Sequence, residues 1–241
     1  MNSLIRNLSL LNQSKRNSTK KIVGEKIIEI APLKALYIPI PKVACSSIKR
    51  AIAEFLKIEI PNNGINIHNA HYPIVDRDIL HQYDDYWKFC FVRNPWDRLV
   101  SCYTEKIKAD NNFSGITGSF VNGIHKGFVK YGIFKANMPF NEFLKAVASI
   151  PDHEAEQHFR SQYTFIVDAH GNSLVDFAGR FENINEDFDS ILKTLNASSE
   201  LSLSRSNKTR HKNYREYYSD ESLSIFSERY SQDIIRFNYK F

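Results

Sequence analysis

The segment PKVACSSIKR, residues 41–50, combines residue types that can hold an anion. Lys42 offers a positive charge, and Ser46 and Ser47 offer hydroxyl groups close to it in the sequence. The apolar run LKALYIPI precedes the segment as a predicted buried strand, and apolar residues at helical spacing follow it. Because a helix amino terminus presents free N–H groups and the positive end of the helix dipole, this turn is predicted to bind a phosphate or sulfate group.

The predicted turn contains no glycine, which separates it from the nucleotide loop GxxxxGK[ST]. Val43, Ala44 and Cys45 form the turn, and its lysine comes before them rather than after. On this segment alone, a plain strand-to-helix connection with a solvated lysine is the alternative. Cys45 is interpreted as a small residue that fills a tight turn, since no histidine stands near it in the sequence.

A second segment, RNPWDRLVSCYTEKI, repeats the arrangement after the apolar run WKFCFV. Arg93 leaves the end of the predicted strand, and Ser101 follows two helical turns later, so both could reach one anion. Asn94 is a suitable N-cap and Pro95 a suitable first helical residue. Ligands of open α/β sheets bind at the carboxyl ends of the strands, so the two turns together suit a ligand with two separated phosphates. The alternative is that Arg93 and Asp97 only pair across the turn.

The elements that position these turns alternate between strand and helix, which predicts an α/β domain with a mainly parallel central sheet. Strands are expected at residues 34–40 and 87–92. Residues 165–168 and 174–181 are expected to form a hairpin or a strand pair. Besides the helices that follow the two turns, helices are expected from Pro139, over 183–195 and over 220–236.

Residues 1–24 are predicted to form a flexible tail and residues 25–241 a single domain. The region 110–137 has weak periodicity and is predicted to be a long excursion that carries short helical pieces. Long loops of this kind inside a compact domain are usually functional or disordered. Its aromatic residues, together with one from an earlier segment, form either the wall of a ligand site or an ordinary satellite core: Tyr72, Phe113, Phe120, Phe128 and Tyr131.

The composition is that of a soluble globular protein: 42% of the 241 residues are hydrophobic, 24% are charged, and the net charge is +5. This basic excess fits an anionic ligand, and no known nucleic-acid module appears, so no nucleic-acid partner is predicted. The amino-terminal residues do not form a signal peptide, and at most a peripheral membrane helix is expected there. The three cysteines are odd in number and are not spaced like zinc ligands, which indicates reduced thiols and a cytoplasmic location.

The two anion-binding segments resemble, in order, the paired signatures of the carbohydrate sulfotransferases, in the branch that includes the Golgi chondroitin and HNK-1 enzymes. PKVACSSIK is similar to the family's PKV-C-(S/T) turn, and FVRNPWDRLVSCY to its RDP-(F/W)-(E/D)-RL-SAY segment. EQHFRSQ resembles the family's HW-PQ segment, and GRFENINEDF resembles its RFE strand end. With the carboxy-terminal run YSQDIIRFNYKF, the resemblance spans about residues 34–241.

The resemblance implies a P-loop-like three-layer sandwich and an enzyme that needs no metal. It also implies the donor 3′-phosphoadenosine 5′-phosphosulfate (PAPS) and a hydroxyl-bearing carbohydrate acceptor, with the excursion at 110–137 and its aromatic residues at the acceptor site. The first turn would hold the 5′-phosphosulfate, with Lys42 also acting in catalysis on the bridging oxygen. The implied donor ligands are Lys42, Val43, Ala44, Cys45, Ser46 and Ser47 for the 5′ end, Arg93 and Ser101 for the 3′-phosphate, and Asn207, Lys208 and Thr209 in a closing flap.

A general base must take the proton of the acceptor hydroxyl. His71 lies 22 residues before Arg93, similar to the position of the catalytic histidine in uronyl 2-O-sulfotransferases, and is the predicted base. His68 is the reserve candidate. His158 falls on the histidine of the HW-PQ segment, which is expected to shape the acceptor site.

The sequence departs from the family at Asn94, where the family has aspartate, and at Phe159, where it has tryptophan. The chain also lacks the stem and membrane anchor of the animal enzymes, which leads us to expect a cytoplasmic enzyme of bacterial type. Two other functions stay open at this point. One is a P-loop nucleotide kinase or phosphotransferase, and the other is a non-enzymatic polyanion-binding protein, for which the basic run SRSNKTRHKNYR would be a solvated loop rather than a flap.

Overall fold

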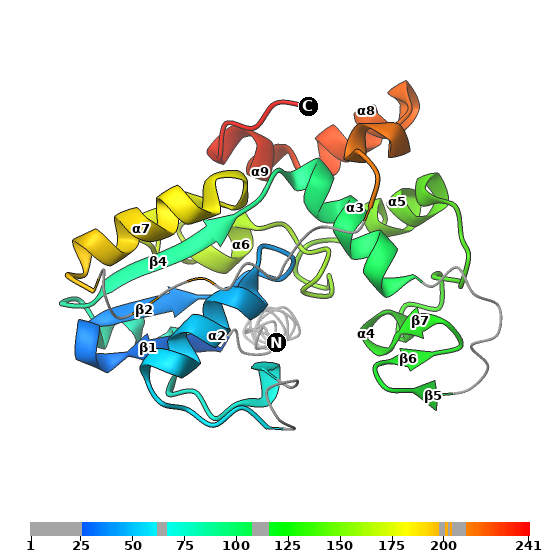
Figure 1. Ribbon diagram of the computed structural model, residues 1–241. Helices are drawn as coiled ribbons and strands as arrows, with labels where there is room; N and C mark the ends of the chain where they lie inside the picture. Colours follow the sequence, from blue (N-terminus) through cyan, green and yellow to red (C-terminus); the bar gives the residue numbers. More distant parts are fainter. Residues whose placement is uncertain (1–25, 62–66, 108–115, 198–200, 202, 204–210) are drawn as a thin grey trace, which may run out of the picture.

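The computed structural model describes residues 26–61, 67–107, 116–197, 201, 203 and 211–241. Within these residues the main sheet has five strands in the order β3-β1-β2-β4-β8, and helices flank it (Figure 1). The strands are β1 Ile27–Ile30, β2 Ala35–Ile38, β3 Ile74–Val75, β4 Trp87–Val92 and β8 Phe177–Arg180. None of the helices in the described ranges is long and apolar enough to cross a membrane.

The sheet is mixed rather than mainly parallel. β2, β4 and β8 run parallel, as predicted, but β1 is antiparallel to both β2 and β3. A single 3₁₀ turn, Ala31–Leu33, joins β1 to β2, and Lys34 closes it in the left-handed conformation (φ 46°). A connection this short cannot cross over a sheet, so it returns the chain antiparallel.

The helices that follow the two predicted anion-binding turns are present: α2 Cys45–Phe55 after β2 and α3 Pro95–Lys106 after β4. The expected helices at Pro139 and at 183–195 are confirmed as α5 Phe140–Ala148 and α7 Ile184–Thr194. The single helix expected over 220–236 is wrong. It breaks into α8 Asp220–Arg229 and α9 Ser231–Arg236 at Tyr230, whose buried hydroxyl donates to the carbonyl of Phe159 (2.6 Å).

The hairpin expected over 165–181 is also wrong. Residues 163–166 form a short helix, α6 Tyr163–Ile166, because the buried carboxylate of Asp233 accepts the N–H groups of Gln162 and Tyr163 (2.8 Å each). Only a single bridge, Val167 to Ser173, joins the two segments. The following strand, β8, pairs with β4 instead.

The described part of the 110–137 region is a small antiparallel sheet followed by one helical turn. Its elements are β5 Ile116–Thr117, β6 Phe120–Val121, β7 Ile124–His125 and α4 Lys126–Val129. Asn122 and Gly123 both have positive φ (48° and 78°), so the Asn-Gly pair turns β6 directly into β7. Short helical pieces were therefore the wrong prediction except for α4, and Phe128 belongs to the core, where it is fully buried.

Candidate functional site

The connection between β2 and α2 forms its turn by backbone conformation rather than by glycine. Lys42 and Ala44 both have left-handed φ values, 73° and 60°. Ala44 is the N-cap of α2, and among the described residues no side chain caps this helix end. The N–H groups of Ser47 and Ile48 turn back to the carbonyl of Ala44 (3.0 and 3.2 Å). The amino terminus of α2 therefore has a left-handed N-cap and no side-chain cap among the described residues.

Two arginines of the β4–α3 segment bind the carbonyl oxygens of this first turn. Arg98 donates from Nε to the carbonyl of Pro41 (2.9 Å), and Arg93 donates from Nη1 to the carbonyl of Lys42 (3.2 Å). In a planar trans peptide the N–H points opposite to the C=O. The N–H groups of Lys42 and Val43 consequently point away from the two arginines.

The side chain of Lys42 is almost buried (11% exposed) and forms an ion pair with Glu105 of α3. Glu105 also pairs with Lys106, at 3.0 Å between Nζ and Oε1. Desolvation alone would raise the pKa of Glu105, but the charges of Lys42 and Lys106 outweigh it and lower that pKa to about 2. Glu105 is therefore ionised at neutral pH and balances the charge of Lys42.

The second turn is held by side chains. The buried guanidinium of Arg93 pairs with Asp97 (2.7 Å) and lies over the ring of Phe181, 4.3 Å from its centroid. The amide of Gln162 clamps the backbone of Arg93 by accepting from its N–H and donating to its carbonyl, both at 2.9 Å. The pairing of Arg93 with Asp97, considered as an alternative from the sequence, is thus present together with the link from Arg93 to the first turn.

Asn94 caps α3 by accepting the N–H of Asp97 (3.1 Å), as predicted. Its own N–H donates to Glu182 (2.6 Å), whose other oxygen accepts from the hydroxyl of Tyr239 (2.8 Å). The RFE-like segment and the carboxy-terminal run therefore meet at the second turn. Ser101 is buried on α3. The flap residues Asn207, Lys208 and Thr209 lie outside the described residues.

The three candidate histidines occupy different positions. His68 has its Nε2 3.0 Å from the Oγ of Ser46, in the first turn of α2. His71 is exposed and lines a cavity of about 400 Å³ with Lys26, Lys49 and His68 among other residues. Desolvation, with the charge of Lys49, lowers the pKa of His68 to about 4. His68 is therefore neutral at pH 7.

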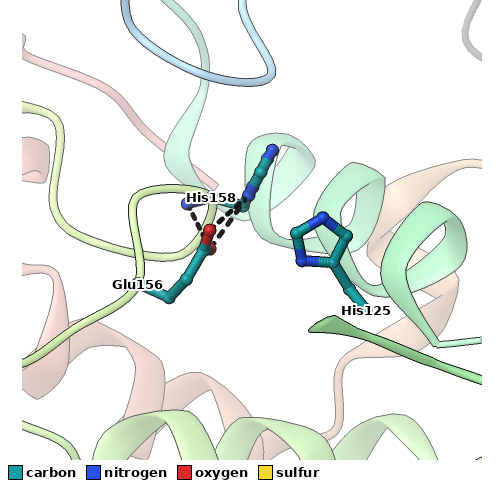
Figure 2. A group of neighbouring side chains, drawn as sticks. All are labelled: His125, Glu156 and His158. Atoms are coloured by element: carbon teal, nitrogen blue, oxygen red, sulfur yellow. Dashed lines mark hydrogen bonds and ion pairs between the residues drawn. The ribbon is translucent and has the colours of Figure 1, made fainter. Parts of the chain in front are cut away.

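His158 belongs to a group of three side chains with His125 and Glu156 (Figure 2). The Nδ1 of His158 lies 2.8 and 2.9 Å from the two carboxylate oxygens of Glu156, and the ring of His125 lies 5.1 Å from that of His158. Desolvation lowers the pKa of His158, Glu156 opposes this shift, and Lys106 and Lys42 add to it. The pKa of His125 is lowered to about 4 by desolvation and by Lys106. The segment that carries His158 lies beside the first turn, because Arg98 donates to the carbonyls of Gln157 and Arg160 as well as to that of Pro41.

Cys45 lies in the first turn, and burial raises the pKa of its thiol although Lys49 and Lys42 oppose the shift. A neutral thiol is a poor nucleophile, which supports the interpretation of Cys45 as a residue that fills the turn. Cys90 and Cys102 are buried free thiols.

Sequence reasoning did not identify Glu105, Glu156 and Gln162. Glu105 follows Ser101 by four residues on a helix, a spacing that places both on one face and was a usable signal. Glu156 and Gln162 stand at the two ends of EQHFRSQ, which lies outside regular helices and strands from Glu156 to Ser161. Their contacts with His158 and Arg93 join separate segments or depend on loop geometry, so no periodicity indicates them.

Comparison with known proteins gives matches over nearly the whole chain. Residues 31–240 match the profile described as "Sulfotransferase family". Carbohydrate sulfotransferase 11 of Rattus norvegicus is 26% identical over 92% of this chain and 68% of its own length. Carbohydrate sulfotransferase 8 of Homo sapiens is 26% identical over 83% of this chain and 49% of its own length. No solved structure gives a significant match.

Proposed function

This chain belongs to the sulfotransferase family, and from that premise we propose that it transfers the sulfuryl group of PAPS to a hydroxyl of a carbohydrate. The observation that carries the proposal is the union of the two anion-binding turns at one edge of the sheet, where Arg93 of the second turn donates to the carbonyl of Lys42 in the first. PAPS carries a 5′-phosphosulfate and a 3′-phosphate, so it needs two such sites. The parallel strands β2, β4 and β8, with a helix after β2 and β4, support the P-loop-like layering.

The residues present fit the donor. The uncapped amino end of α2 and the N–H group of Val43, turned away from Arg93, suit the 5′-phosphosulfate. Ser46 and Ser47 add hydroxyl donors on the first turn of that helix. Arg93 and Ser101 are assigned to the 3′-phosphate. Lys42 forms an ion pair with Glu105. To bind the donor, Lys42 must leave this carboxylate and pair with the 5′-phosphosulfate instead.

Sulfuryl transfer resembles phosphoryl transfer in that positioning and charge stabilisation dominate the catalysis. Lys42 neutralises the charge that grows on the bridging oxygen as the bond to the nucleotide breaks. Removal of such a contact typically lowers the rate by about 10²–10³-fold. A histidine takes the proton of the acceptor hydroxyl, and His71 stays the prediction made from its position in the sequence.

The donor site is tested by thermal unfolding with and without PAP, the desulfated product of PAPS. A ligand at about 100 times its dissociation constant adds about 2.7 kcal/mol to the free energy of unfolding, and about 1 kcal/mol moves the midpoint by roughly 2–4 °C in a chain of this size. We expect a shift of several degrees that ATP does not match. Lys42→Ala should lose most of the shift, whereas Lys193→Ala, an exposed lysine on α7, should keep it.

Two results would redirect the assignment. No shift at saturating PAP would remove the sulfotransferase proposal, and a shift that depends on ATP and magnesium would favour the nucleotide kinase. Duplex binding that falls steeply with salt, in a protein without PAP affinity, would favour the polyanion-binding protein.

A further inference from the structure

We propose that Glu156 and His158 form a carboxylate–histidine dyad in which Nε2 of His158 takes the proton of the acceptor hydroxyl. The inference rests on the proposed sulfotransferase function and deepens it, because it assigns the catalytic base to a residue that position in the sequence does not favour. Glu156 acts through His158 and is a positioning residue.

The hydrogen bonds of the dyad fix which ring nitrogen carries the proton. Nδ1 of His158 faces both oxygens of Glu156 at 2.8 and 2.9 Å, and the backbone N–H of His158 donates to the same carboxylate (2.8 Å). A carboxylate at these distances requires a proton on Nδ1, which leaves the lone pair of Nε2 as an acceptor. In Figure 2 the second ring nitrogen of His158 points away from Glu156.

The dyad is partly accessible and lies beside the donor turn. The side chains of His158 and Glu156 are 16% and 11% exposed, so both are largely buried and neither is fully enclosed. Arg98 donates to the carbonyl of Pro41 in the first turn and to the carbonyls of Gln157 and Arg160, on either side of His158. This guanidinium holds the segment that carries the dyad against the turn assigned to the 5′-phosphosulfate.

The step balances as a single displacement. The acceptor oxygen forms a bond to sulfur as its proton moves to Nε2 of His158. The bond between sulfur and the bridging oxygen breaks, and the electron pair leaves on that oxygen, where Lys42 neutralises it. Glu156 stabilises the imidazolium that results until His158 releases the proton to solvent.

A metal site is the competing interpretation, because ligand atoms of His125, Glu156 and His158 lie within 4.8 Å of one another. The hydrogen bonds favour the dyad. His125 accepts the N–H of Gly127 at its Nδ1 (3.2 Å), so metal binding at Nε2 would put a proton on Nδ1 facing that N–H. His158 would have to give up Nδ1–H to share Glu156 as a fellow ligand.

The test uses the full chain with radiolabelled PAPS and chemically desulfated chondroitin as the polysaccharide acceptor. We expect His158→Ala to lower kcat by about 10²–10⁴-fold and to keep the thermal shift with PAP. Added imidazole should restore part of the turnover. His153→Ala, a neighbouring and largely exposed histidine, should stay near the wild-type rate and serves as the matched control.

Glu156→Gln separates a positioning role from a merely structural one. Glu156 raises the pKa of His158, so its loss should move the acidic limb of the kcat/KM profile to lower pH as well as lower kcat. The titratable groups that face His158 and must be considered in this profile are Glu156, His125, His68, Lys106 and Lys42.

Three outcomes would overturn the dyad. Turnover of His158→Ala within about threefold of the wild type would exclude His158 as the base, since a base contributes at least about 10²-fold. Turnover lost in His71→Ala but kept in His158→Ala would return the role to His71. Activity abolished by a chelator and restored by zinc would assign the three side chains to a metal. A failure of PAP to bind the wild type is a separate result, which removes the proposed function itself.

Discussion

The two turns at the edge of the sheet are formed by different means. The β2–α2 turn depends on left-handed backbone at Lys42 and Ala44 and has no side-chain cap within the described residues. The β4–α3 turn depends on side chains: Asn94 caps the helix, and Gln162 clamps the backbone of Arg93. The second turn is held by side chains of the protein, and its arginines in turn hold the carbonyl groups of the first.

The largest expected effect comes from Arg98→Ala. Arg98 is buried and donates to the carbonyls of Pro41, Gln157 and Arg160. A buried group left without its partner costs about 1–3 kcal/mol, so losing this guanidinium should lower the free energy of unfolding by about 3 kcal/mol or more. Thermal unfolding should record a midpoint lower by roughly 6 °C or more, with the PAP shift reduced as well. An unchanged midpoint would mean that the first turn keeps its conformation without the hydrogen bonds of Arg98.

Asp233 accepts the backbone N–H of Gln162, the residue that clamps Arg93 in the second turn. The stability that Asp233 contributes should depend on pH. Desolvation raises the pKa of this buried carboxyl to about 6, against the N–H bonds from Gln162 and Tyr163. Because its pKa in the folded protein lies above the ordinary value of 3.8, its contribution to stability is complete below about pH 4 and is lost as pH rises through 6. Asp233→Asn should remove this slope, which amounts to a few kcal/mol.

Unfolding midpoints of the wild type and of Asp233→Asn between pH 4 and 7 would measure this contribution, since all other titrating groups are shared. If the midpoints of the two proteins change with pH in parallel, Asp233 makes no pH-dependent contribution to stability. A difference of opposite sign would mean that the two backbone N–H groups dominate over desolvation.

The left-handed backbone of the first turn predicts that Ala44→Gly stabilises the protein. An L-residue with a side chain pays about 1 kcal/mol in this conformation and glycine does not, so the midpoint should rise by roughly 2–4 °C. Ala51→Gly, in the interior of the same helix, should lower the midpoint instead. If both substitutions destabilise the protein, the strain assigned to Ala44 is absent.

The smallest effect is expected for Glu105→Gln, which releases Lys42 from its counter-ion. Glu105 is 52% exposed, and partly exposed pairs of this kind contribute about 0.2–1 kcal/mol, so PAP should bind roughly two- to fivefold more tightly. Isothermal titration would measure the change, with Glu142→Gln on the exposed face of α5 as control. Weaker PAP binding would mean that Glu105 orients Lys42 for the donor rather than competing with it.

Local signals predicted the elements whose causes are local. β2 and β4 are continuous apolar runs, and α3 begins where Asn94 and Pro95 indicate a cap and a first residue. The Asn122-Gly123 pair carried an equally local signal for the β6–β7 hairpin and was overlooked.

Other elements depend on contacts between distant segments, which local patterns do not contain. α6 forms because Asp233 binds its first N–H groups, and the carboxy-terminal helix breaks where Tyr230 bonds to Phe159. The candidate site divides in the same way. Lys42 and Arg93 could be predicted from their turns, whereas the partnership of Arg93 with Gln162 could not.

The hydrogen bonds from Tyr239 to Glu182 and from Glu182 to Asn94 have a consequence for synthesis. Asn94 leaves the ribosome long before Glu182, Asp233 and Tyr239, so the second turn emerges without the partners that fix it. The nascent chain can form β2 and β4 early, but it cannot complete the platform that orients the first turn until its last segment is translated. The proposed donor site can therefore be completed only after Tyr239 has been translated.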